Sequence, residues 1–169
     1  MSFSVKRTAE GPGWRRVYWR LPILVAVLLV VVVHRAGLSG TLGQSLWRQT
    51  PMAGVVADLI AVAGLIVMLW ARKTLGANWS SEVVLKQNHE LIERGPYAYV
   101  RHPIYTGVIL MALGTMILFA RLSGFVAWVI FVFGFWLKAR EEERLLAKHF
   151  PEAYPTYKAR VKAVIPFVL

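Results

Sequence analysis

Four apolar stretches dominate the chain, and each is close to the length of a membrane-spanning helix. They run from Tyr18 to Ala36, from Pro51 to Ala71, from Pro103 to Ala120 and from Leu122 to Leu137. A spanning helix needs about 20 apolar residues, with roughly 17–25 tolerated, so the second and third stretches suffice alone. The first spans if Arg20 and Arg35 extend to the two interfaces, and the fourth spans if it continues into Lys138–Arg140.

These stretches predict an all-α integral membrane bundle of about four transmembrane helices. We expect one domain over residues 1–169, with N-terminal spans in 1–74 and a loop, hairpin and tail in 75–169. A tight turn at Arg121–Gly124 joins the last two spans into a hairpin, and Phe150–Val161 is typical of an amphipathic helix lying on the membrane. A cleaved signal peptide is disfavoured because three further spans follow the first one. A soluble bundle is disfavoured because such long uncharged runs leave no polar face.

Composition supports a membrane protein. The 169 residues are 57% apolar and 17% charged, with a mean hydropathy of +0.51, whereas soluble domains average roughly 45–50% apolar and 25% charged residues. The chain has no cysteine, which excludes a disulfide scaffold, thiolate metal sites and cysteine nucleophiles.

The chain has a net charge of +11, and its basic residues are concentrated in three regions outside the apolar stretches. Of 20 basic residues, 17 lie before the first span, between the second and third spans, or after the fourth span. With four spans these three regions share one side, which the positive-inside rule makes cytoplasmic. We therefore expect the N-terminus, the central loop and the C-terminus in the cytoplasm, where the bases can bind anionic headgroups. No aromatic residues alternate with the bases, so a nucleic-acid surface is not indicated.

One cluster of candidate site residues precedes the third span. Arg101 and His102 stand before Pro103, at a helix N-terminus whose free N–H groups favour an anionic group. Nearby, Tyr97, Tyr99 and Tyr105 offer flat faces that could enclose a planar ring. The alternative is that the tyrosines are interface anchors and that Arg101 is only a topology charge.

A second cluster follows the fourth span, where Glu141, Glu142 and Glu143 hold a third of the chain's nine acids. A solvated face of salt bridges is the usual explanation of such a run. Here, however, the run follows a span that a short turn pairs with the helix beginning at Pro103. Because the two ends of a hairpin are neighbours, we expect these acids beside Arg101 and His102.

Other common chemistries are absent from the sequence. There is no glycine-rich dinucleotide motif, no P-loop and no G-x-S-x-G elbow. The four histidines show no metal-ligand spacing, so no metal site is predicted.

The motifs Gly95-Pro-Tyr-Ala-Tyr-Val-Arg-His-Pro-Ile-Tyr-Thr-Gly107 and Glu142-Glu143 occur together with a tail of Phe150, Tyr154, Tyr157, Val161 and Pro166. This combination closely resembles the isoprenylcysteine carboxyl methyltransferase family, within the wider group that includes phospholipid methyltransferases. The resemblance covers roughly residues 75–169. It implies S-adenosylmethionine as the cofactor and a lipid or lipid-linked acceptor that enters from the bilayer.

The resemblance also implies roles for individual residues. The cofactor contacts fall at Lys86, His89, Glu90, Leu91, Ile92, Tyr97, His102, Pro103, Ile104, Tyr105 and Glu142. Lys138 matches a basic residue near the substrate carboxylate, where eukaryotic members carry arginine.

The chemistry of the residues agrees with these roles. Glu142 can hold the ammonium of the cofactor. A carboxylate acceptor, already ionised near pH 7, needs only a cation for positioning, for which Lys138, Arg140 and Arg101 are candidates. An amine acceptor needs a base, for which Glu143 is the nearest candidate.

The leading hypothesis is methylation of a prenylcysteine-type carboxylate, with phospholipid amine methylation as the alternative. A sterol-type NADPH reductase, which shares an Arg-His-Pro-x-Tyr-like hairpin, and a non-catalytic membrane protein are more distant. The latter is disfavoured because Asp58 is the only charge inside the membrane once Arg20 and Arg35 extend to the interfaces, and a transport pathway usually has more.

Overall fold

The computed structural model describes residues 18–36, 40–76 and 91–165, and all its longer elements are helices. The α-helices are α1 (Arg20–Arg35), α2 (Pro51–Leu75), α3 (Pro103–Phe119), α4 (Leu122–His149) and α5 (Ala153–Arg160). Two short 3-10 helices, η2 (Thr41–Gly43) and η4 (Gly95–Ala98), lie in the connections. No strand occurs in the described ranges, where only two isolated β-bridges are present.

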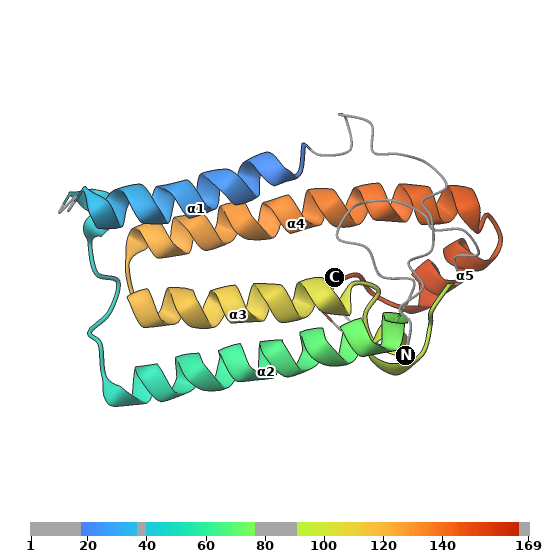
Figure 1. The fold of residues 1–169 in the computed structure, drawn as a ribbon, viewed down its shortest axis with the longest axis horizontal. Coiled ribbons are helices and arrows are strands. Elements are labelled where there is room, and N and C mark those ends of the chain that lie inside the picture. The colour runs from blue at the N-terminus through green and yellow to red at the C-terminus, as the bar shows by residue number, and fades with distance from the viewer. Residues whose placement is uncertain (1–17, 37–39, 77–90, 166–169) are drawn as a thin grey trace, which may run out of the picture.

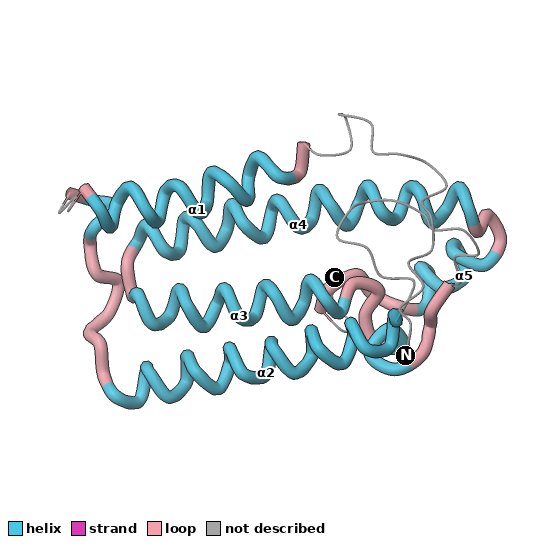
Figure 2. Tube along the Cα trace, viewed as in Figure 1, coloured by secondary structure: helices cyan, strands magenta, loops and turns pink. Residues whose placement is uncertain are grey.

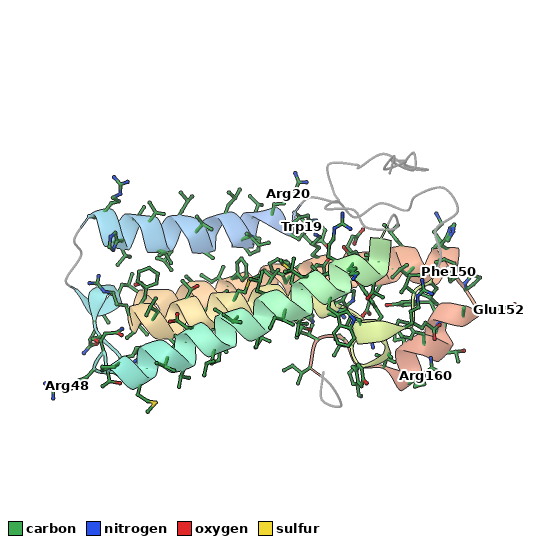
Figure 3. The ribbon with its side chains drawn as sticks, turned by 60° about the horizontal axis from the view of Figure 1, so that its bottom comes forward. Trp19, Arg20, Arg48, Phe150, Glu152 and Arg160 are labelled. Carbon is green, nitrogen blue, oxygen red and sulfur yellow. The ribbon has the colours of Figure 1, made fainter. Side chains whose placement is uncertain are left out.

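The four long helices form two adjacent pairs, with α1 along α4 and α2 along α3 (Figure 1). The α3–α4 hairpin joins the pairs, and α4 continues past the other long helices towards α5 (Figure 2). Arg48 lies at one end of this bundle, whereas Phe150, Glu152 and Arg160 lie at the other end (Figure 3). Arg160 of the tail therefore lies at the end of the bundle opposite to Arg48 (Figure 3).

Two of the described helices, α2 and α4, are long and apolar enough to cross a membrane, and α3 is a shorter apolar helix of 17 residues. Large apolar side chains on α2 face outward, among them Leu59, Val62 and Ile66, which are all more than half exposed. A helix in the core of a soluble protein buries such residues, so this outer face of α2 suits a lipid environment.

Local sequence explains where α2 begins and ends. The Thr50 side chain accepts a hydrogen bond from the backbone N–H of Ala53, and Pro51 occupies the first helical position, where no N–H is needed. The helix ends at Gly76, whose φ of +55° suits glycine. The helix continues four residues past the apolar stretch, to Leu75. Its last turn contains Arg72 and Lys73, so the apolar pattern alone did not include it.

The hairpin turn lies earlier than the sequence indicated. Ala120 adopts a left-handed conformation with a φ of 48°, and α4 already begins at Leu122. The predicted turn at Arg121–Gly124 is therefore wrong by one residue at its start and by three at its end, because Leu122, Ser123 and Gly124 are helical. The connection between α1 and α2 stabilises the turn, since Leu46 donates its N–H to the Ala120 carbonyl at 2.7 Å.

Small residues let α2 and α3 approach closely. A Cβ atom added to Gly107 would lie 2.5 Å from the Gly64 carbonyl oxygen, and one added to Gly114 would lie 2.5 Å from the Ala57 carbonyl oxygen. Close approach of this kind, through glycine and alanine, is how helices associate in a membrane, where no hydrophobic force drives them together.

We expect Gly107→Leu to separate α2 from α3 and to lower the free energy of unfolding by at least about 1–3 kcal/mol. Gly54→Ala on α2 is the matched control, because an added Cβ at Gly54 meets no atom within 4 Å. Alanine also favours a helix over glycine by roughly 0.5–1 kcal/mol. Thermal unfolding of the detergent-solubilised protein measures both, and a Gly107→Leu midpoint equal to that of the unaltered protein contradicts this packing.

Candidate active site

The two ends of the hairpin bring the two predicted clusters together. Helix α3 begins at Pro103, directly after Arg101 and His102, and α4 runs uninterrupted from the apolar stretch through the three acids. Glu142 and Glu143 consequently lie beside Arg101, His102 and Tyr105, as the hairpin argument predicts.

Glu143 is fully engaged by cations of the protein. Its Oε1 accepts hydrogen bonds from Arg101 Nε at 3.0 Å and Arg101 Nη2 at 2.7 Å, and it lies 3.2 Å from His102 Nε2. Its Oε2 accepts from Lys158 Nζ at 2.7 Å. The side chains of Arg101 and Glu143 are only 9% and 12% exposed, so water competes little for these charge-assisted bonds.

Glu142 is more open than Glu143 and has acceptor capacity to spare. One carboxylate oxygen accepts a hydrogen bond from the Tyr105 hydroxyl, and the other lies 3.6 Å from His102 Nδ1. The side chain is 24% exposed, twice as much as that of Glu143. Since an ionised carboxylate has about four lone-pair sites, Glu142 can still bind a cationic ligand.

Aromatic rings surround these carboxylates. The rings of His102 and Tyr105 stack with centroids 5.2 Å apart and an interplanar angle of 4°. The Lys138 ammonium lies 4.4 Å from the centroid of the Trp19 ring and 5.2 Å from that of the Tyr105 ring. Lys138 is buried, and cation–π contact with desolvated rings offsets part of the cost of burying its charge.

The C-terminal tail packs against the segment that precedes α3. The Arg101 and His102 N–H groups donate to the carbonyls of Lys162 at 2.8 Å and Ala163 at 2.9 Å. The Tyr157 hydroxyl on α5 donates to the Tyr97 carbonyl at 2.6 Å. Tyr154 and Tyr157 are buried against Val161, Leu91, Leu146 and Phe150, so these rings of α5 face the protein.

Sequence reasoning gave these tail residues no role, although Tyr154, Tyr157 and Val161 belong to the family pattern. A spacing of three and then four residues does signal one buried helical face. Nothing in that spacing reveals that Lys158 reaches Glu143.

A small cavity lies between the tail and the loop that precedes α3. It has a volume of about 60 Å³, and its lining includes Leu91, Ile92, Tyr97, His102 and Tyr154. The Tyr154 ring, which forms part of this lining, is buried.

Most of the predicted site residues that the structure describes converge on this end of the bundle. Leu91, Ile92, Tyr97 and His102 line the cavity, while Pro103 and Tyr105 are buried at the start of α3 and Ile104 is half-buried beside them. Lys86, His89 and Glu90 lie outside the described residues. Two predicted positions point elsewhere: Arg140 is exposed, with its guanidinium 4.5 Å from the Trp136 ring centroid, and Tyr99 is 61% exposed.

Protonation of His102 is coupled to the two carboxylates. Burial alone would lower the pKa of His102, but hydrogen bonds to Glu142 and Glu143, and their charges, outweigh burial and raise the pKa above its ordinary value. Burial, reinforced by the Glu142 charge, also raises the pKa of Tyr97, so this phenol stays protonated at neutral pH.

We expect the protein to lose stability as pH rises from about 6.5, the unperturbed pKa of histidine. The raised pKa belongs to the folded state, so protonated His102 stabilises the fold below the unfolded pKa, and this contribution is lost as pH rises through the folded pKa. The thermal unfolding midpoint should therefore fall as pH rises from about 6.5 through the raised pKa of folded His102. The midpoint of His102→Gln should fall less over the same pH range. Parallel pH profiles of the two proteins contradict this coupling.

Fold and site together define a helical protein with membrane-compatible helices and a half-buried, cation-accepting carboxylate at one end of an apolar hairpin. Comparison with known sequences narrows this class. The sequence profile of the isoprenylcysteine carboxyl methyltransferase (ICMT) family matches residues 56–148. The chain belongs to this family, and membership of a methyltransferase family implies a methyl donor.

Individual proteins that are similar to this chain are named protein-S-isoprenylcysteine O-methyltransferase. The protein-S-isoprenylcysteine O-methyltransferase of Saccharomyces cerevisiae is 33% identical over 125 residues, which cover 70% of this chain and 51% of the relative. Those of Schizosaccharomyces pombe and Homo sapiens are 36% identical over 99 residues and 31% identical over 124 residues. These matches cover 55% and 72% of this chain and 41% and 44% of the relatives. The chain thus matches about half of the length of these relatives.

Proposed function

We propose that this chain is a membrane methyltransferase that uses S-adenosylmethionine and methylates the carboxylate of a lipid-linked acceptor of the prenylcysteine type. The observation that carries the proposal is the state of Glu142. This carboxylate is partly open and only partly satisfied, and it lies beside stacked aromatic rings at the end of an apolar hairpin. It lies within the segment that matches the methyltransferase family.

The carboxylate and the aromatic rings at this site fit S-adenosylmethionine, which combines an ammonium, a sulfonium and a carboxylate with a planar base. Glu142 would hold the ammonium, and the rings of Tyr97, His102 and Tyr105 would border the ligand. Leu91 and Ile92 supply apolar contacts at the cavity. By resemblance to the family, Lys86, His89 and Glu90 complete the cofactor set.

When bound, the cofactor supplies an electrophilic methyl group, and the task of the protein is alignment and exclusion of water. A carboxylate acceptor is ionised at neutral pH and needs no general base. Lys138 is the positioning cation that we favour, because it is buried next to Tyr105 while Arg140 is exposed.

The geometry also supports different roles for the two glutamates. Glu143 accepts from Arg101 and Lys158 and lies within hydrogen-bonding distance of His102, which leaves it little basicity for catalysis. We therefore assign Glu143 and Arg101 a positioning role, in which they fix His102 and the tail around the site. Glu142 alone remains as the carboxylate for the ligand.

An apolar groove of about 300 Å³ offers a place for the hydrocarbon chain of the acceptor. The groove lies between α1, α3 and α4, and its walls include Val30, Met116 and Phe131. The Phe131 ring contacts Phe135 at 4.9 Å between centroids, and Phe135 contacts Tyr105 at 5.0 Å. A continuous row of rings thus connects the groove with the site.

The proposal includes a four-span topology with the site on the cytoplasmic side. Helices α2 and α4 meet the length and hydropathy of a span. By residue count, α1 and α3 are about 24–26 Å long, so basic and aromatic residues at their ends, such as Trp19, Arg20 and Arg35, would have to reach the interfaces. Orientation follows from the basic residues of the loop and tail. Arg160, at the end of α5 and with an exposed side chain, would lie near the headgroups.

Calorimetric titration of the purified protein in detergent with S-adenosylhomocysteine tests the cofactor assignment. We expect saturable binding with one site per chain, since this product of methyl transfer keeps the ammonium and the base of the cofactor. A titration without saturable heat, performed with protein that unfolds cooperatively, overturns the proposed function.

A further inference from the structure

Helix α4 carries one exposed stripe along most of its length. Its apolar part consists of four side chains, each 43–49% exposed and spaced by four, four and three residues: Phe125, Val129, Phe133 and Trp136. Arg140 and Arg144 continue the stripe at steps of four residues and are also exposed. Because residues three or four apart lie on the same side of a helix, these side chains form a single outward face. That face changes from apolar to basic between Trp136 and Arg140.

This change of character fits the boundary of a membrane. Helix α4 has the length and hydropathy of a spanning helix, and tryptophan and arginine are typical of the level where acyl chains give way to headgroups. With Trp136 at that level, Phe133 and Val129 would contact acyl chains. Arg140, about 6 Å further along the helix, would then lie at the level of the lipid phosphates.

The Arg140 guanidinium is held by a ring and not by a carboxylate. It lies 4.5 Å from the centroid of the Trp136 ring, which in turn stacks on Phe133 with centroids 5.6 Å apart. Arg101 and Arg144 each pair with a glutamate, whereas the Arg140 side chain makes no hydrogen bond or ion pair with any residue in the described ranges. A ring engages the flat face of a guanidinium and leaves the N–H groups at its edge able to bind an oxyanion.

We propose that this face of α4 binds an anionic phospholipid, with Arg140 donating to the phosphate and with Phe133 and Val129 contacting an acyl chain. This site is separate from the proposed methyl-transfer site, because Arg140 and Glu142 are two residues apart and do not share a helix face. Its ligand is a lipid rather than a free phosphate, since a free phosphate has no part to place against the apolar half of the face.

The charges beside Arg140 indicate which headgroup fits. Arg144 adds a second positive charge, and Glu141 neutralises part of it at 3.0 Å. The excess is therefore positive, which complements a phosphodiester that carries an uncharged alcohol, as in phosphatidylglycerol. A choline headgroup brings its own cation to this positive face and fits it less well.

Native mass spectrometry of the detergent-solubilised protein tests the proposal, with phosphatidylglycerol and phosphatidylcholine of identical acyl chains as the two ligands. We expect the unaltered protein to bind phosphatidylglycerol more tightly. Arg140→Gln should weaken this binding about 5-fold, as for loss of one charge near the headgroups, and should change phosphatidylcholine binding little. Trp136→Leu keeps an apolar side chain but removes the ring that holds the guanidinium, so it should weaken phosphatidylglycerol binding about 2- to 5-fold.

Lys148→Gln is the matched control. It removes one positive charge from an exposed position of the same helix, but Lys148 lies eight residues past Arg140, about 12 Å further from the apolar part of the face. Its affinity for phosphatidylglycerol should equal that of the unaltered protein. Neither Arg140→Gln nor Lys148→Gln should change the thermal unfolding midpoint without added lipid, because both side chains are exposed.

Three results overturn the proposal. The first is equal affinity of the unaltered protein for the two lipids. The second is an equal loss of phosphatidylglycerol binding in Arg140→Gln and Lys148→Gln, which means that net charge alone attracts the lipid. The third is displacement of bound phosphatidylglycerol by millimolar inorganic phosphate, which means that the site takes a free anion.

Discussion

Glu142→Ala is expected to lower the affinity for S-adenosylhomocysteine about 10- to 150-fold and to remove methyl transfer at ordinary cofactor concentrations. Hydrogen bonds to charged groups contribute roughly 1.5–3 kcal/mol, which corresponds to this range. The effect should be this large because Glu142 is the carboxylate in the site with free acceptor capacity, whereas Glu143 is engaged by Arg101 and Lys158. Calorimetry with the purified variant measures the change.

Two comparisons keep this result specific. Glu142→Gln preserves shape and the hydrogen bond from Tyr105 but loses the charge, so most of the affinity should still disappear. Asp58→Asn removes the one charge within the apolar stretch of α2, at an exposed position far along the chain from the site, and should leave binding unchanged. If Glu142→Gln binds as tightly as the unaltered protein, the ammonium is not held by this carboxylate.

Arg101→Ala is expected to have the largest effect on stability. The guanidinium holds Glu143 and donates to the carbonyls of Lys158 and Val161. Its loss leaves the nearly buried carboxylate with only Lys158 and His102 as partners and removes the donor from both tail carbonyls. Breaking a buried ion pair from one side costs about 3–5 kcal/mol. Thermal unfolding in detergent should show a midpoint lowered by many degrees, with the tail loosened from the loop.

The double variant Arg101→Met/Glu143→Leu separates an unpaired charge from lost packing. If Arg101→Ala loses stability because the Glu143 charge is left without its arginine, replacing both residues by Met and Leu should restore much of the free energy of unfolding. Arg144→Ala removes a partner of Glu141 whose own side chain is 68% exposed, and it should cost at most about 1 kcal/mol. Equal effects of Arg101→Ala and Arg144→Ala contradict the structural importance of the Arg101 network.

The long helices were predictable because their signal is continuous apolarity. The first stretch, Tyr18–Ala36, corresponds to α1, and the third, Pro103–Ala120, matches α3 to within one residue, since Pro103 marks its start. The fourth continues as a helix past Lys138, as a span of adequate length requires. The meeting of Arg101 with Glu143 followed from hairpin topology alone.

Features set by tertiary contact were not predictable. Tyr97 and Tyr99 are equivalent in the sequence, but the short helix η4 buries the first and exposes the second. Lys158 looks like any tail lysine until α5 docks and places its ammonium 2.7 Å from Glu143. The position of the hairpin turn depends on a left-handed alanine, Ala120, for which the sequence carries no signal comparable to glycine.

The most direct test of the central claim is transfer of a labelled methyl group from S-adenosylmethionine by the purified protein in detergent. A synthetic prenylcysteine with a free carboxylate and an amine-bearing phospholipid are offered in parallel reactions. The account predicts label in the prenylcysteine that mild base releases, because the product is a methyl ester. Base-stable label in the phospholipid, or no label in either lipid despite cofactor binding, contradicts it.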